Sequence, residues 1–258
     1  MSWFGDIGET VGGWFGSSGG NILGGLASTA LTGLALSLIS KSINNSQSAP
    51  ATATAVDTGV VVNIPPDTDQ KIPVLYGSHH FAGIITEAVM STDNKTMTYV
   101  ITLCERTGNL LSTGAASQFT FYDIYWNNNR ITFNSDGVTA HYTQDAAGNI
   151  DRNIDGLVKV WCFAGGSIKD YNQVPTDYTQ GTQVNAWDLV PNWTNAHTMT
   201  NLVFAVVQVT YNKTNGTTGL GNMLFHITNS MTQPGDCLYD YMTNTRYGAG
   251  IAAGDIQL

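Results

Sequence analysis

The sequence is poor in charged residues. Aspartate, glutamate, lysine and arginine together make up 11% of the 258 residues, and the formal net charge is −9. The 10 lysines and arginines form no basic stripe, and a basic stripe is the electrostatic footprint of nucleic-acid binding. We therefore expect no specific nucleic-acid binding. Neutral polar residues supply the polarity instead, and they suit surfaces that pack closely against copies of the same chain.

Cysteine is scarce, and no metal-binding pattern is present. Cys104, Cys162 and Cys237 are widely spaced and include no Cys-x-x-Cys pair, which argues against a zinc or redox motif. We expect three buried thiols in a protein assembled in a reducing cytosol. The adjacent His79 and His80 would point to opposite faces of a strand, and no third ligand stands at a useful spacing. We therefore expect no metal and no cofactor.

Motifs of familiar catalytic chemistry are also missing. The chain has no Gly-x-Ser-x-Gly and no His-Glu-x-x-His sequence. A glycosidase needs two carboxylates flanking a sugar, and Glu87 and Glu105 are the only glutamates after the first 45 residues. Glu105 stands beside Arg106 just after a predicted strand, which favours a salt-bridged turn. Asp123 is expected at a sheet edge or an interface, so we predict that the chain is not an enzyme.

What the first 45 residues do contain is a glycine-rich leader followed by an apolar stretch. No charged residue lies between Glu9 and Lys41, and the first charges are acidic, so no secretory signal peptide is expected. The stretch 22–43 predicts a helix capped by Asn21, which at about 1.5 Å per residue would be about 33 Å long and could cross a bilayer. The apolar residues assigned to this assembly or membrane helix are Ile22, Leu26, Leu31, Leu34, Leu38 and Ile39.

Two interpretations of the stretch 22–43 stay open. Its serines and threonines lower the hydropathy, and Gly24, Gly25 and Gly33 weaken the helix. Small residues let helices approach one another closely in a symmetric assembly, so we expect a helix buried in an assembly. The alternative is transient membrane contact through residues 22–43. A small-residue linker at 46–58 separates the leader from the rest of the chain.

The region 59–258 is predicted to be mainly β, with antiparallel sheets of a barrel-like kind in one unit or two intertwined subdomains. A hairpin is expected through Asn127-Asn128-Asn129. The run Leu202–Tyr211 predicts a central strand that is buried on both faces from Val203 to Val207. Other strands are expected at 97–103, 119–126, 130–133, 141–144 and 157–163.

One later segment, 234–243, is predicted to be a short helix. Its residues Leu238, Tyr241 and Met242 fall on one helical stripe, which we expect to pack against the β body. The residues expected to shape its ends are Ser230 or Thr232 as the N-cap, Pro234 and Asp236 in the first turn, and a left-handed Gly248 after the last turn.

Two segments of the chain resemble a known family. They are Ile72-Pro73-Val74-Leu75-Tyr76-Gly77-Ser78 and the run from Pro234 to Ile251, which includes Leu-Tyr-Asp-Tyr-Met-Thr-Asn-Thr-Arg-Tyr-Gly. Together they resemble the N-terminal part of the central tail-tip proteins of tailed phages, the tip attachment proteins of lambda-type phages. The likeness covers about residue 60 to the end. The residues that carry it are Pro73, Tyr76, Gly77, Leu238, Tyr239, Asp240, Asn244, Arg246, Tyr247 and Gly248.

The resemblance implies a structural protein of the virion at the distal end of the phage tail. In that family the region forms hub domains, three copies of which close the end of the tail tube. The expected partners are two further copies of the chain and the other tail-tip, tail-tube and tape-measure proteins. Family members usually continue into receptor-facing parts, so we assign no receptor role to these residues.

Two alternative functions follow from other features of the sequence. A membrane-active tail protein would insert its N-terminal helix into the host envelope during DNA ejection. A carbohydrate-binding adhesin would use Trp126, Trp187 and Trp193 as exposed rings against a host sugar. Solvent exposure of those rings distinguishes the adhesin from a packed structural protein.

Overall fold

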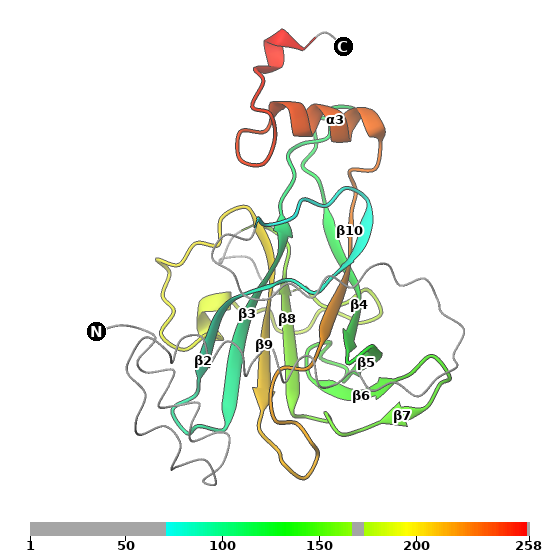
Figure 1. The fold of residues 1–258 in the computed structure, drawn as a ribbon, viewed down its shortest axis with the longest axis vertical. Coiled ribbons are helices and arrows are strands. Elements are labelled where there is room, and N and C mark those ends of the chain that lie inside the picture. The colour runs from blue at the N-terminus through cyan, green and yellow to red at the C-terminus, as the bar shows by residue number, and fades with distance from the viewer. Residues whose placement is uncertain (1–70, 167–172, 257–258) are drawn as a thin grey trace, which may run out of the picture.

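The computed structural model describes residues 71–166 and 173–256, which form two antiparallel β-sheets and one short helix (Figure 1). The six-stranded sheet has the order β1-β10-β4-β5-β6-β7, and the four-stranded sheet has the order β2-β3-β9-β8. The strands are β1 (Ser78–Phe81), β2 (Ile84–Met90), β3 (Thr96–Glu105), β4 (Phe119–Trp126), β5 (Asn129–Phe133), β6 (Ala140–Gln144), β7 (Ile150–Asp151), β8 (Val158–Phe163), β9 (Leu202–Thr210) and β10 (Met223–Asn229).

The predicted fold class is confirmed, since the described residues are mainly β with the single α-helix α3 (Pro234–Thr243). The predicted helix at 22–43 and the linker at 46–58 lie outside the described residues. Within the described ranges, no helix has the length and apolar character needed to span a bilayer.

The predicted hairpin is confirmed as the connection from β4 to β5. Asn127 and Asn128 occupy the turn with φ angles of 51° and 67°. Two successive positive φ angles match the turns whose twist fits that of paired strands, and asparagine tolerates this conformation better than most residues do. Asn127 also accepts a hydrogen bond on its side chain from the backbone N–H of Asn222 at 2.9 Å, which ties the turn to the start of β10.

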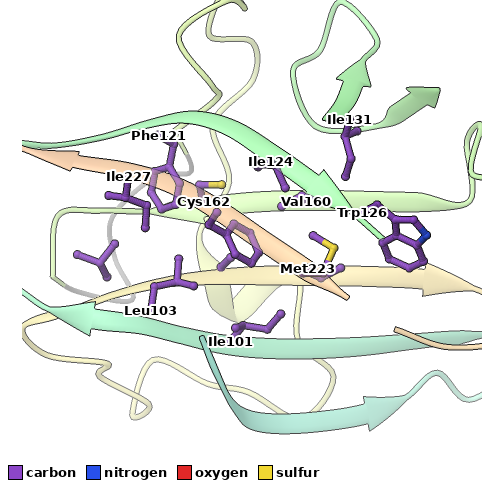
Figure 2. Packing of buried hydrophobic residues seen from close by; sticks show 14 of the residues in the cluster. Ile101, Leu103, Phe121, Ile124, Trp126, Ile131, Val160, Cys162, Met223 and Ile227 are labelled. Carbon is purple, nitrogen blue, oxygen red and sulfur yellow. The ribbon is translucent and has the colours of Figure 1, made fainter. Parts of the chain in front are cut away.

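The main core lies between the two sheets (Figure 2). Phe121, Phe225 and Ile227 reach into it from the six-stranded sheet, and Ile101 and Leu103 reach into it from the four-stranded sheet. All five side chains are almost fully buried. Because one cluster draws on both sheets, the sheets stabilise each other through apolar packing.

The predicted central strand is also confirmed. In β9, Val203, Ala205 and Val207 belong to the main core, while Phe204 and Val206 belong to a second cluster on the other side of the four-stranded sheet. Alternate side chains of a strand point to opposite faces, so a strand buried on both faces is apolar throughout. The short 3-10 turn η1 (Ala186–Asp188) contributes to the second cluster.

At Gly83 the chain crosses from the six-stranded sheet to the four-stranded sheet. This residue has a φ of +73°, and a Cβ there would lie 2.4 Å from Cγ2 of Ile101, so only glycine fits without a shift. Strands β1 and β2 thereby follow each other in sequence but belong to different sheets. The last strand, β10, completes the six-stranded sheet from within, because it pairs with both β1 and β4.

Helix α3 lies beyond the ends of the strands, at one end of the long axis of the molecule (Figure 1). The chain enters it directly from β10 and leaves it through a segment that contains the short turn η2 (Ala253–Asp255) and extends further from the sheets. The contacts that hold α3 in this position determine the candidate functional site.

Candidate functional site at the α3 junction

Helix α3 turns its acidic side chains toward the β body and its apolar side chains toward solvent. Leu238 and Tyr241 are 61% and 51% exposed, whereas Asp236 and Asp240 are each 5% exposed. The prediction that Leu238, Tyr241 and Met242 pack against the body is therefore wrong for the first two, and Met242 is only half-buried. The physical reason is that the surface under α3 offers hydrogen-bond donors rather than apolar side chains.

Asp240 is the centre of this junction. Its Oδ2 accepts hydrogen bonds from the hydroxyl of Tyr76 at 2.8 Å and from the hydroxyl of Tyr247 at 2.6 Å. Its Oδ1 accepts a hydrogen bond from the backbone N–H of Gly108 at 2.9 Å. A Cβ at Gly108 would lie 2.8 Å from this Oδ1, so glycine allows the close approach. Three donors from three separate segments therefore converge on one carboxylate.

The two tyrosines at the junction are held as hydrogen-bond donors. Burial raises the pKa of Tyr76 above its ordinary value, and the hydrogen bond to Asp240 raises this pKa further. Burial likewise raises the pKa of Tyr247, with the hydrogen bond to Asp240 as the second cause. Each hydroxyl thus keeps its proton over the physiological pH range and donates it to the carboxylate, which makes these charge-assisted hydrogen bonds.

Asp236 fixes the other end of α3. Its Oδ1 accepts the backbone N–H of Ser112 at 3.0 Å, and its Oδ2 accepts the hydroxyl of Ser112 at 3.1 Å. Asp236 and Asp240 are four positions apart, so both side chains lie on one face of the helix. The segment between β3 and β4 thereby donates hydrogen bonds to both buried carboxylates: Ser112 donates to Asp236, and Gly108 donates to Asp240.

Asn229, at the end of β10, bonds to Leu75 and Thr107, which adjoin Tyr76 and Gly108, and to Met231. Its side-chain amide donates to the carbonyl of Leu75 at 2.6 Å and to the hydroxyl of Thr107 at 2.8 Å. Its Oδ1 accepts the N–H of Met231 at 3.0 Å. The residue is 2% exposed, so its hydrogen bonds replace those that water would make.

An ion pair between Glu105 and Arg246 supports the junction from the side. Nη2 of Arg246 lies 3.0 Å from Oε1 and 2.8 Å from Oε2 of Glu105. The expected salt-bridged role of Glu105 is present, but the partner is distant in sequence. The neighbouring Arg106 instead donates to the carbonyls of Gly165 and Ser117. The expectation that Arg106 would be the partner was wrong, because its guanidinium is bound by these two carbonyls instead.

The ends of α3 also differ from the prediction. Pro234 starts the helix as expected, but the N-cap is Gln233, which makes no side-chain capping hydrogen bond, so neither Ser230 nor Thr232 is the cap. The helix ends at Thr243, before Gly248. Gly248 has no left-handed conformation, yet a Cβ there would lie 1.9 Å from the carbonyl oxygen of Tyr241. It is therefore required for close packing of the chain after the helix.

The structure brings the two segments of the family resemblance together. The hydroxyl of Tyr76 reaches Asp240 although the two residues are 164 positions apart. Gly77 accepts the N–H of Asn229 at 2.6 Å and donates to the carbonyl of Met231 at 3.1 Å. The carbonyl of Pro73 accepts the N–H of Glu105, the partner of Arg246.

The remaining motif residues lie around the same helix. Oδ1 of Asn244 accepts the N–H of Arg246 at 2.8 Å, which shapes the turn after α3. Tyr239 lines an open hollow of about 420 Å³ between α3 and the segment at Gly108. Leu238 is the exception among the motif residues, because it faces solvent and takes no part in the junction.

The end of the molecule that carries α3 has most of the exposed large apolar side chains of the described chain. Six such side chains are more than a third exposed, and four of them belong to this end of the molecule, namely Leu111, Leu238, Tyr241 and Ile251. Leu111 precedes Ser112, which is bonded to α3, and the N–H of Ile251 donates to the carbonyl of Met242 at 2.8 Å. We call these four residues the α3 surface.

A second polar cluster lies on the outer face of the six-stranded sheet. His80 stacks on His226 with ring centroids 4.3 Å apart, and Nε2 of His226 lies 2.9 Å from the hydroxyl of Ser78. Asp123 forms an ion pair with Arg130 at 2.5 Å and lies 4.0 Å from Nδ1 of His226. Asp123 stands on β4, an inner strand of the sheet, so the sheet-edge position was wrong, and its position at an interface stays a prediction.

The histidines and cysteines that stood out in the sequence are separate from the junction, apart from Cys237. His79 contacts Phe81 and not the ring partners of His80. Within residues 71–166 and 173–256, no three His, Cys, Asp or Glu side chains are grouped to hold a metal ion. Cys104 and Cys162 are buried as expected, whereas Cys237 in α3 is only half-buried.

The three tryptophans of the adhesin alternative form no exposed platform. Trp126 is 7% exposed and belongs to the main core. Trp187 and Trp193 pack against the second cluster, and the indole N–H of Trp193 bonds to Glu87. Trp126 is buried and the other two rings are partly buried, so none of the three is the exposed ring that would have favoured sugar binding.

The chain was also compared with known proteins. No protein-family model matches it, and no curated protein matches it either. The geometry of the junction and the residues that form it are therefore the basis for assigning a function.

Proposed function

We propose that this chain is a structural component of the tail tip or baseplate hub of a tailed bacteriophage and that it is an assembly protein, not an enzyme. In this proposal three copies form a ring that closes or extends the distal end of the tail tube. Neighbouring tail-tip, tail-tube or tape-measure proteins bind to that ring. The α3 surface is the contact that each copy offers to a neighbour.

One observation carries the proposal: the two segments that resemble the tail-tip family meet at a single buried carboxylate. Tyr76 from the first segment and Tyr247 from the second both bond to Asp240. The junction therefore joins residues from both ends of the described region. Its effect is to present α3 rigidly beyond the sheets.

The outward face of α3 is suited to binding another protein. Exposed apolar side chains that gather at one place are typical of protein interaction sites. The two carboxylates of the helix point inward, so the outward face of α3 carries no charge that a partner would have to desolvate. Tyrosine is among the residues that most often carry the binding energy of an interface, and Tyr241 is the candidate here.

The test is an electron cryo-microscopy reconstruction of the virion that carries this chain. We expect the chain at the distal end of the tail, in three copies, with Leu238 and Tyr241 in contact with a neighbouring subunit. Particles assembled with Leu238→Asp should lack the chain or the neighbour it binds, while Ile150→Asp, which changes an apolar residue 53% exposed at the far end of the sheet, should assemble normally. A location away from the tail, or an α3 surface open to solvent in the assembled particle, would contradict the proposal.

A further inference from the structure

Two histidines from neighbouring strands stack on each other on the outer face of the six-stranded sheet. His80 in β1 stands directly opposite His226 in β10. The two rings are nearly parallel, with 10° between their planes and 4.3 Å between their centroids. Two positive charges so close together repel each other, so the contact accommodates one charged imidazole and is weakened by a second. We call this pair the His80–His226 stack.

A carboxylate stands on the His226 side of the stack. Strand β4 has a bulge opposite His226, which brings both Tyr122 and Asp123 against one residue of β10. Oδ2 of Asp123 lies 4.0 Å from Nδ1 of His226. The same carboxylate forms an ion pair with Arg130 at 2.5 Å, so its negative charge is shared. Asp123 therefore does not balance two charged imidazoles.

His80 is the ring whose charge the fold disfavours. It is half-buried, and burial lowers its pKa below the ordinary 6.5, with His226 and His79 as further causes and Asp123 as an opposing one. The titratable and charged groups around the stack are His79, His226, Tyr122, Asp123, Tyr125, Arg130 and Asp177. Among these groups only the two aspartates carry negative charge in the acidic range, and both are bonded to Arg130.

Strand β1 depends on this stack because it has few other contacts with a strand. It is four residues long and stands at the end of the sheet order, so β10 is the only described strand that pairs with it. Tyr76, four positions before His80, donates the hydrogen bond that reaches Asp240 in α3. The stack is therefore connected through a few residues of backbone to the α3 junction.

We propose that the His80–His226 stack is a pH-sensitive switch that holds β1 on β10 at neutral pH and releases it in acid. At neutral pH the stack keeps β1 in register and Tyr76 within reach of Asp240. In acid a proton on His80 drives the two rings apart, β1 leaves β10, and α3 loses the hydrogen bond from Tyr76. The other hydrogen bonds of the helix remain, so its orientation loosens while the helix itself stays folded. This inference goes beyond the proposed function and does not depend on it.

Hydrogen exchange of the full-length chain at pH 7.5 and pH 5.5 tests the switch. The wild type is compared with His80→Phe, whose ring still stacks but takes up no proton. Each rate at pH 5.5 is divided by the rate of the same segment at pH 7.5, and the intrinsic pH dependence of exchange cancels between the two proteins. In β1 and α3 this ratio should be up to about ten-fold larger for the wild type, because the opened state binds the proton with the ordinary histidine pKa of about 6.5. In β9 the two proteins should agree.

Three further variants sharpen the test. His80→Gln also removes the site of protonation and should abolish the acid response even if a phenylalanine fits poorly. Asp123→Asn removes the negative charge that supports a protonated stack, so the transition should move to lower pH, which a merely structural role would not cause. His197→Phe is the matched control, because His197 stacks on Trp193 and not on a residue of β1 or β10, and it should keep the wild-type response.

The outcomes decide the proposal in both directions. A response that is lost in both His80 variants and kept in His197→Phe supports the switch. The same acid response in the wild type and the His80 variants would overturn it, and so would an equal acceleration in β9, which indicates unfolding of the whole body. An acid response of β1 that does not reach α3 would overturn the coupling to the junction. All of these measurements use the isolated chain, so the proposed function is still decided by the virion reconstruction.

Discussion

The β body and the α3 junction are stabilised by different kinds of interaction. Between the sheets, side chains such as Phe225 and Ile227 are fully buried and make apolar contacts. At the junction the buried groups are carboxylates, an amide and tyrosine hydroxyls, and the apolar residues of the helix face outward. Apolar packing tolerates small shifts, whereas hydrogen bonds depend on direction and distance. The junction is thus suited to fixing the orientation of α3, and the body to supplying the stability.

The largest expected effect comes from removing an aromatic side chain between the sheets. Phe225→Ala should lower the free energy of unfolding by roughly 3–5 kcal/mol, since a cavity remains where a fully buried ring was. Urea unfolding followed by tryptophan fluorescence measures this loss. A loss below about 1 kcal/mol would contradict the assignment of the main core.

Removing the central carboxylate of the junction should have the next largest effect. Asp240→Ala deprives Tyr76, Tyr247 and Gly108 of their acceptor and should cost roughly 2–3 kcal/mol, the range for hydrogen bonds to a charged group. Hydrogen exchange should rise mainly in α3 and much less in β9, because the body keeps its apolar core. Asp255→Ala, which changes an exposed aspartate, is the control. Equal increases in α3 and β9 would show that the junction and the body unfold together.

A pair of glycines in and after α3 tests how tightly the junction is packed. Gly248→Ala should cost roughly 1–3 kcal/mol, because its Cβ would overlap the carbonyl of Tyr241 and the backbone must move. Gly235→Ala, in the first turn of the helix, meets no atom within 4 Å and should be neutral or stabilising by about 0.5 kcal/mol. Thermal unfolding of both variants gives the comparison, and a harmless Gly248→Ala would contradict the close contact.

The body should also respond to pH through His80. Burial lowers the pKa of His80 below 6.5, and the neighbouring His226 and His79 lower it further, against the opposing effect of Asp123. The unfolded chain therefore takes up the proton first. Stability is highest above pH 6.5 and decreases as the pH falls toward the lowered pKa. Unfolding measured from pH 7.5 to 5 should show this decrease, and His80→Phe should reduce it. An unchanged slope in that variant would assign the effect to other groups.

The smallest effect on stability is expected from the apolar face of α3. Leu238→Ala should change the free energy of unfolding by less than about 0.5 kcal/mol, because the side chain is already 61% exposed. The same substitution should still weaken binding of a neighbouring subunit if the α3 surface is an interface. A loss of 2 kcal/mol or more, which is about what a buried leucine gives, would show that this face packs against the body.

The strands could be predicted because their determinants are local. An uninterrupted apolar run gave β9 its burial on both faces, and two asparagines in a row marked the turn between β4 and β5. These patterns follow from the alternation of side chains and from the conformations that asparagine tolerates. The existence of α3 was predictable in the same way, from the spacing of its residues and from Pro234 in its first turn.

The orientation of α3 could not be predicted, because its determinants are distant in sequence. An apolar stripe is normally the buried face of a helix, and Leu238 and Tyr241 met that criterion. The groups that turn the acidic face of α3 toward the body are the N–H of Gly108 and the N–H and hydroxyl of Ser112. These donors follow no periodic pattern in the sequence. Asn229 and Asp236 were missed as junction residues for the same reason. One signal was present, namely two aspartates four positions apart on a short helix without a basic partner.

The position of β10 has a consequence for synthesis on the ribosome. Strands β1 and β4 both pair with β10, although β10 is the last of the described strands to leave the ribosome. At about 5–20 residues per second, roughly 5–20 s pass between completion of β4 and completion of β10. During that interval β1 has no partner strand in its sheet and one edge of β4 is open. Nascent chains on neighbouring ribosomes are then exposed to intermolecular strand pairing, so a slower elongation rate over residues 127–222 should increase aggregation of this protein before it increases the yield of folded chain.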